Sequence, residues 1–418
     1  MAVSRVHILR HLVTMRAFGK RLARLGGRAR LVLHVHIGMS INSTTGEVLS
    51  TWLRKAAKGP VDMARVTKDD DGLRLLMAAS AWALAVDLAV ALGYNDDETL
   101  ISRKHKQVLA LVRLQRYEEA LISLGVVLGC TTVAPNTPQY IVFHLLRVEI
   151  YLALEDEREA SIVVWELQGL AAQDCLQQPM VRLCVDLCAV KLLLVKGDLK
   201  SALAMLLRLL ELELYTDPSC RVVLLCDILK VLLQMGGMQF CAHYQTLLRA
   251  TLASNPQLGE NRLAHLAAVT HASVVFAQGD YAAALESFEV CISRAAAALQ
   301  RENSVAMAGP GLALLPTGEH AYFGMQDSSN LLLEAVNNAS VCFLHSKQIS
   351  EAVERLEGLV QSNPALFLQP VVIFNLCTMY DLSCTVELSD NKKRALHMLT
   401  KEYGVNTIPW TAFRITIS

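Results

Sequence analysis

Apolar residues recur at intervals of three and four positions over long windows of this chain, most of them rich in Leu and Ala. That period places the apolar residues on one face of an α-helix. Alternating polar and apolar runs are rare, and aromatic residues, which favour strands, make up only 6% of the chain. The pattern therefore predicts an all-α protein.

A short turn recurs between successive helical windows, and its clear copies are residues 114–120, 195–202, 278–284 and 346–352. In each copy a Gly or polar residue ends one helix and a large apolar residue opens the next. An Ala three positions later lets the two helices approach closely. We predict that the residues which pack these repeats together are Tyr117, Ala120, Ala202, Gly279, Tyr281, Ala284, Ala352 and Pro364, the last of which stops a helix.

Two weaker copies, at 155–160 and 236–242, complete a series. With the small residue as marker, positions 120, 160, 202, 242, 284 and 352 follow one another at steps of about 40 residues, and the last step is 68. A minimal tetratricopeptide unit has about 34 residues. The spacing predicts a tetratricopeptide-type helical-hairpin solenoid of about six units with long inter-repeat loops.

The domain boundaries follow from loop and cap signals. Residues 301–330 contain Gly and Pro residues typical of a loop, which predicts an insertion there. The solenoid is expected over 71–418 and ends in a capping helix and tail at 389–418, with Ser389 as a helix cap and Gly404 as its end. Residues 75–86 lack charge but are too few to span a bilayer, so we expect one buried helix there.

Charge is balanced overall but not along the chain. Lys plus Arg and Asp plus Glu number 39 each, which argues against a nucleic-acid partner. No Asp or Glu precedes Glu47, whereas eight Lys or Arg residues do. We therefore expect residues 1–70 to be a basic, poorly ordered extension. An organellar transit peptide and a basic membrane-surface helix remain open.

The sequence contains no motif typical of catalysis: no phosphate-binding Gly loop, no Gly-x-Ser-x-Gly and no His-Glu-x-x-His. We predict no enzyme activity, no cofactor, no bound metal and no small-molecule substrate. Cys184 and Cys188 lie four apart, as half of a metal site would, but no matching pair accompanies them. The eleven cysteines fall mostly in apolar helical patterns without a secretory signal, so buried reduced thiols are expected.

Four residues are candidates for partner contact. Asn337 and Asn338 lie on the first helix of a predicted unit, where an amide can hydrogen-bond the backbone of a ligand. The alternative is a hydrogen bond within the repeat stack. Trp410 and Phe413 follow the last helix and either cover the apolar end of the solenoid or anchor another subunit.

Three segments carry a resemblance to a known family: residues 336–344, 354–364 and, most specifically, 372–382, which reads Val-Ile-Phe-Asn-Leu-Cys-Thr-Met-Tyr-Asp-Leu. Together they resemble the C-terminal region of the subunit-12 family of the trafficking protein particle complex. The resemblance is strong over 265–384 and extends more weakly from 75 onward. The acidic N-terminal region of animal members is absent here, and the tail after Gly404 differs.

The resemblance implies a non-enzymatic scaffold subunit of a multisubunit vesicle-tethering complex. Such a subunit would act in endoplasmic-reticulum-to-Golgi transport and autophagy. Its partners would be the other subunits of the particle and, indirectly, a Rab GTPase and a transport-vesicle or Golgi membrane. The implied location is cytoplasmic, at the endoplasmic reticulum and Golgi. A stand-alone peptide-binding adaptor and an organellar repeat protein imported through residues 1–70 are the alternatives.

Overall fold

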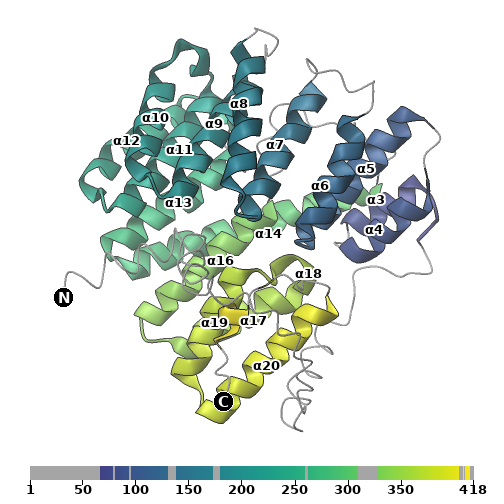
Figure 1. The fold of residues 1–418 in the computed structure, drawn as a ribbon. Helices are drawn as coiled ribbons and strands as arrows, with labels where there is room; N and C mark the ends of the chain where they lie inside the picture. The colour runs from purple at the N-terminus through teal and green to yellow at the C-terminus, as the bar shows by residue number, and fades with distance from the viewer. Residues whose placement is uncertain are drawn as a thin grey trace. The chain divides into compact units, whose positions relative to one another are not determined.

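A computed structural model describes residues 66–78, 81–93, 96–129, 138–172, 179–258, 262–308, 328–403, 408 and 410–414, and within these ranges all regular structure is helical (Figure 1). The described helices fall into two compact units: a first unit up to Ala335 and a second unit from Val336 onward, so the chain passes from one to the other inside α16 (Ser328–His345). The predicted all-α class is confirmed. Residues 1–65 of the predicted basic extension lie outside the described ranges.

Six helical hairpins follow one another along the chain, as the spacing predicts. Their first helices are α5 (Asp97–Arg113), α7 (Pro138–Ala153), α9 (Pro179–Lys196), α11 (Pro218–Met235), α13 (Arg262–Gln278) and α16. Their second helices are α6 (Tyr117–Leu128), α8 (Glu157–Ala172), α10 (Leu199–Glu211), α12 (Met238–Ala253), α14 (Tyr281–Ala308) and α17 (Ile349–Ser362).

In every hairpin the first helix ends at a residue whose backbone is in the left-handed conformation, with positive φ. Its φ lies between 60° and 89° at Gln115, Glu155, Gly197, Gly236, Gly279 and Lys347. In the first hairpin the amide of Arg116 donates to the carbonyl of Leu111 at 2.8 Å. This reversed bond satisfies a carbonyl that the helix end leaves open. The turn is therefore one structural motif repeated six times, and it is filled by Gly in only three hairpins.

Residues other than glycine are strained at positive φ. Replacing such a turn residue by Gly should therefore raise the stability of the fold, and replacing a turn Gly by Ala should lower it. Glu155→Gly and Lys347→Gly, both at exposed sites, should each stabilise the fold by about 0.5–1 kcal/mol. Gly279→Ala should destabilise it by about 1 kcal/mol. Urea unfolding measures all three, and the same sign of change for Glu155→Gly and Gly279→Ala would contradict the shared turn.

A fully buried small residue lies five positions after each left-handed residue. Ala120, Ala160, Ala202, Ala284 and Ala352 are all 0% exposed. In the fourth hairpin this position is Cys241, also 0% exposed, whereas the predicted marker Ala242 is exposed. The marker is corrected to Cys241 because the left-handed residue is Gly236, and the second glycine, Gly237, is the N-cap of α12.

Enlarging one of these residues should separate its helix pair. We expect Ala284→Leu to cost about 1–3 kcal/mol by overpacking, since Ala284 is fully enclosed between α13 and α14. Ala282→Leu on the exposed side of the same helix is the matched control and should leave the thermal midpoint almost unchanged. Equal effects of the two substitutions would contradict the packing role of Ala284.

The hairpins of the first unit form two layers. Helices α7, α9, α11 and α13 contact one another in series, and each second helix packs between its own first helix and the next. We call the row of first helices the first-helix layer. The charge-free stretch 75–86 is not one helix, as predicted, but spans two: α3 (Asp70–Ala78) and α4 (Trp82–Ala91), which pack on α5.

Helix α14 is longer than any other helix described, at 28 residues. It runs from its partner α13 to α3, so it joins the two ends of the first unit (Figure 1). The insertion predicted at 301–330 is therefore wrong at both borders, since helix continues to Ala308 and α16 begins at Ser328. Residues 309–327 lie outside the described ranges.

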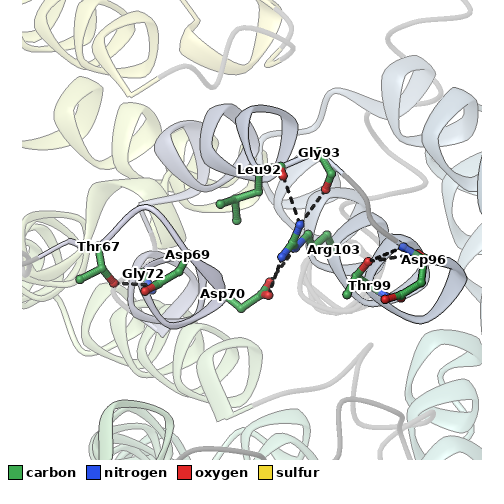
Figure 2. Close-up of polar contacts among 9 residues, drawn as sticks. All are labelled: Thr67, Asp69, Asp70, Gly72, Leu92, Gly93, Asp96, Thr99 and Arg103. Carbon is green, nitrogen blue, oxygen red and sulfur yellow. Dashed lines mark hydrogen bonds and ion pairs between the residues drawn. The ribbon is translucent and has the colours of Figure 1, made fainter.

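One arginine ties the N-terminal helices together (Figure 2). The guanidinium of Arg103 on α5 donates to both carboxylate oxygens of Asp70, at 2.9 and 2.8 Å. It also donates to the carbonyls of Leu92 and Gly93 at 3.2 and 2.8 Å, where α4 ends. Because four directed bonds meet on one planar fork, Arg103 fixes α3 and the end of α4 against the first hairpin.

The second unit completes α16 and α17 with α18 (Pro364–Phe367), α19 (Pro370–Ser383), α20 (Val386–Glu402) and the 3-10 helix η4 (Trp410–Phe413). Pro364 opens α18, and only Asn363 separates it from the end of α17. The capping helix predicted from Ser389 begins earlier, at Val386, and Ser389 lies inside it. The Ser389 hydroxyl donates to Asp381 at 2.8 Å instead of capping α20.

Candidate functional site

The first-helix layer carries charges of alternating sign. They are Glu149 on α7, Lys191 on α9, Asp227 and Lys230 on α11, and Glu334 on the part of α16 in the same unit. We call these five residues the first-helix charge row. Lys191 Nζ lies 2.5 Å from Glu149 Oε1, so the pair joins α7 to α9. The row connects hairpins that are distant in sequence.

Within the row, opposite charges shift the pKa values of Asp227 and Lys230 toward their charged forms. Burial raises the pKa of Asp227, and the positive charges of Lys230 and Lys191 oppose that rise. Burial acts to lower the pKa of Lys230, but Glu334 and Asp227 outweigh it, and the pKa ends above its ordinary value. Lys230 therefore keeps its proton at neutral pH. The arrangement holds opposite charges together and gives the layer no strong charge of one sign.

A buried histidine lies in the second hairpin of the same layer. His144 on α7 is 4% exposed, stacks on Tyr140 at 4.3 Å, and its Nδ1 has no hydrogen-bond partner. Burial, with a smaller contribution from Arg147, lowers the pKa of His144 to about 4. The imidazole is neutral at pH 7 and is a packing group there.

Acid should destabilise the fold through His144. The unfolded chain binds this proton near pH 6.5 and the folded chain only near pH 4. The stabilisation is therefore complete above about pH 6.5 and is lost as the pH falls toward 4, by about 2 kcal/mol. Urea unfolding at pH 7 and pH 4.5 should show a smaller loss for His144→Leu than for the wild type. The exposed His243→Leu is the control and should behave like the wild type.

The predicted contact residues Asn337 and Asn338 lie inside the second unit. They are 4% and 7% exposed. Asn375 on α19 donates to Oδ1 of Asn337 at 2.7 Å, and the Asn337 amide donates to Asn338 at 3.4 Å. The predicted partner contact is corrected to an internal one, because these amides join α16 to α19.

Phe413 and Trp410 pack onto the last helix. Phe413 is 0% exposed and its ring lies 4.9 Å from that of His397, while half-buried Trp410 lies 4.6 Å from the same ring. Helix η4 contacts both α19 and α20. Of the two predicted roles, covering the apolar end fits Phe413, whose burial leaves no surface for a partner.

A polar cluster that we did not predict joins the same elements. Asp381 on α19 accepts from Lys393 at 2.5 Å and from Ser389 at 2.8 Å, and Arg414 Nε lies 3.5 Å from its other oxygen. Burial acts to raise the pKa of Asp381, but these hydrogen bonds and the two cations lower it overall. Lys393 is 3% exposed, a burial that its place in a Lys-Lys-Arg run does not indicate.

The cysteines among the described residues are free thiols, and all but the half-buried Cys384 are buried. Burial raises the pKa of Cys188 and Cys226 to about 12 and that of Cys241 to about 11. Cys184 and Cys188 are buried side chains of α9. Among the described residues no group of three His, Cys, Asp or Glu side chains is placed to hold a metal ion.

The described helices include none that is long and apolar enough to cross a membrane.

Comparison with known proteins gives limited matches. No family model matches the chain. A 62-residue stretch is 40% identical to human trafficking protein particle complex subunit 12 and 39% identical to the mouse protein. The stretch covers 15% of this chain and only 8% of either relative.

Among solved structures, the chain is similar to a signal-transduction ATPase with a tetratricopeptide repeat sensor from Pyrococcus horikoshii. The TM-score is 0.40 at 14% identity, over 88% of this chain and 56% of the other. The structure itself is that of an all-α helical repeat protein, and the matches indicate a limited similarity to subunit 12.

Proposed function

We propose that this protein is a non-enzymatic scaffold subunit of a trafficking-particle type of tethering complex. The observation that carries the proposal is the 62-residue match to subunit 12 of the human and mouse particle, on a chain built as a helical solenoid. A solenoid presents extended surface to other proteins and is stabilised by its own repeat contacts.

The described chemistry supports a structural role. The first-helix charge row sets its two lysines among its three acidic residues, the cysteine thiols named above have raised pKa values, and His144 is neutral at pH 7. Protonated thiols and a neutral, buried imidazole are groups that pack a fold. The subunit would contribute binding surface, at the endoplasmic reticulum and Golgi, to a particle whose chemistry resides in other subunits.

Affinity purification of the tagged full chain from its native cells, with quantitative mass spectrometry, tests the proposal. We expect other trafficking-particle subunits in amounts comparable to the tagged chain. Their absence, with an unrelated complex or a chaperone in their place, would contradict the assignment. In that case a peptide-binding adaptor of the same fold becomes the better reading.

The import alternative has its own test. Residues 1–70 fused to a fluorescent protein should remain diffuse in the cytosol if the scaffold proposal is right. Accumulation of the fusion in mitochondria or plastids would favour an organellar repeat protein.

A further inference from the structure

One position on the second helices can be compared across all six hairpins. Seven residues after the left-handed turn residue the side chain is exposed in each of them. The last four hairpins carry small or polar residues there: Ala204, His243, Glu286 and Glu354. The first two carry Ile122 and Ile162, which are 71% and 42% exposed. Packing of the solenoid therefore does not require an apolar residue at this position, and it does not explain why Ile122 and Ile162 are apolar.

Each of the two isoleucines lies in an apolar stripe of its own helix. Ile122, Gly125 and Val126 share one exposed stripe of α6, which Gly129 continues at the C-cap, and Ile162 and Trp165 share one of α8. Trp165 is 76% exposed. Both helices pack on α7, and Figure 1 shows one on each side of it. We call these six residues the outer patch.

Gly125 lies in the interior of α6 without a local reason. Its φ is not positive, and a Cβ added to it would meet nothing within 4 Å. A glycine inside a helix is less favourable than an alanine, so its own hairpin gains nothing from it. Glycine on a helix surface permits the close approach of another backbone. The stripe therefore leaves room for a second helix to approach α6 closely from outside.

The charges around the outer patch have one dominant sign. Helix α6 contains Glu118 and Glu119 and no Lys or Arg, and Glu119 is paired with the N-cap residue Arg116 at 2.6 Å. Helix α8 contains three glutamates and a single arginine, Arg158. Glu118 and Glu166 are exposed beside the apolar stripes. A partner with basic residues flanking its apolar side would complement this rim.

We propose that the outer patch docks an amphipathic α-helix of another protein, with an apolar stripe bordered by Lys and Arg. The partner helix crosses α6 at Gly125 and Gly129, and its large apolar side chains cover Ile122, Val126 and Trp165. This inference rests on the proposed function, because it names the kind of surface through which the scaffold holds a fellow subunit.

Binding to the purified full chain is tested with two labelled synthetic 18-residue helices, one of Leu and Lys and the other of Leu and Glu. We expect saturable binding of the Leu/Lys peptide by fluorescence anisotropy and at least tenfold weaker binding of the Leu/Glu peptide. Ile122→Glu with Trp165→Glu should weaken Leu/Lys binding at least tenfold. His243→Glu, at the equivalent position of the fourth hairpin, is the matched control and should not.

A substitution at Gly125 tests peptide binding without lowering the stability of the fold. Gly125→Leu should keep or raise the thermal midpoint, because the added side chain meets open space and favours the helix. It should nevertheless weaken peptide binding at least fivefold. Equal binding of both peptides, or unchanged binding by the Ile122 and Trp165 double variant, overturns the proposal. A wild type that dimerises through these residues in sedimentation would show a second copy on the patch, which also overturns it.

Co-purification of the double variant beside the wild type separates this inference from the proposed function. Loss of a particle subunit from the double variant alone supports docking at the outer patch. An unchanged set of subunits overturns the docking proposal and leaves the scaffold function intact. If the wild type recovers no particle subunit, the scaffold function fails, and the peptide titration still decides whether the patch binds a basic helix.

Discussion

Phe413→Ala is expected to destabilise the C-terminal unit by about 3–5 kcal/mol, the usual range for truncating a buried aromatic residue. Phe413 is 0% exposed and packs on His397 and Trp410. Its 3-10 helix also contacts α19 and α20, so the cavity left behind would lie between three elements. Those elements cannot close over it without moving the tail.

Urea unfolding followed by circular dichroism measures the effect of Phe413→Ala. Thr411→Ala, on the exposed side of the same 3-10 helix, is the matched control and should shift the free energy of unfolding by less than about 0.5 kcal/mol. Phe413→Leu should recover more than half of the loss, since most of the apolar volume returns. Similar losses for Phe413→Ala and Thr411→Ala would show that the tail does not stabilise the unit.

Asp381→Asn should cost about 2–4 kcal/mol, because it leaves the Lys393 ammonium buried without its carboxylate. Lys393 is 3% exposed, whereas the Asp381 side chain is 35% exposed, so we place the effect below that of a fully enclosed pair. The substitution also weakens the attachment of Arg414, which lies against the same carboxylate. Stability should therefore be lost in the α19, α20 and tail region.

A double-mutant cycle with Lys393→Met distinguishes the buried cation from general disruption. The double variant should be more stable than Asp381→Asn alone, since no unpaired charge remains. The wild type should lose the Asp381 contribution as the pH falls below about 3.8, because the folded pKa lies below that of the unfolded chain. Additive effects of the two substitutions would contradict the pairing.

The repeat architecture could be predicted because its signals are local. Each hairpin turn needs a residue that tolerates positive φ and a small residue five positions later, and both needs are visible in the sequence around Gly197 and Gly279. The six hairpins and the all-α class followed from those turns and from the helical period. Single positions still failed where two candidates were adjacent, as with Cys241 and Ala242.

The sequence by itself determined the six helix pairs and five of the six buried small residues, since these depend on contacts between near neighbours in the chain. Only the tertiary structure decided which polar groups face inward. Asn337 is satisfied by Asn375, 38 residues away, and Lys393 by Asp381 and the Arg414 carbonyl. It likewise showed that Ile122 and Trp165 stay exposed, because burial depends on distant helices whose approach no local pattern encodes.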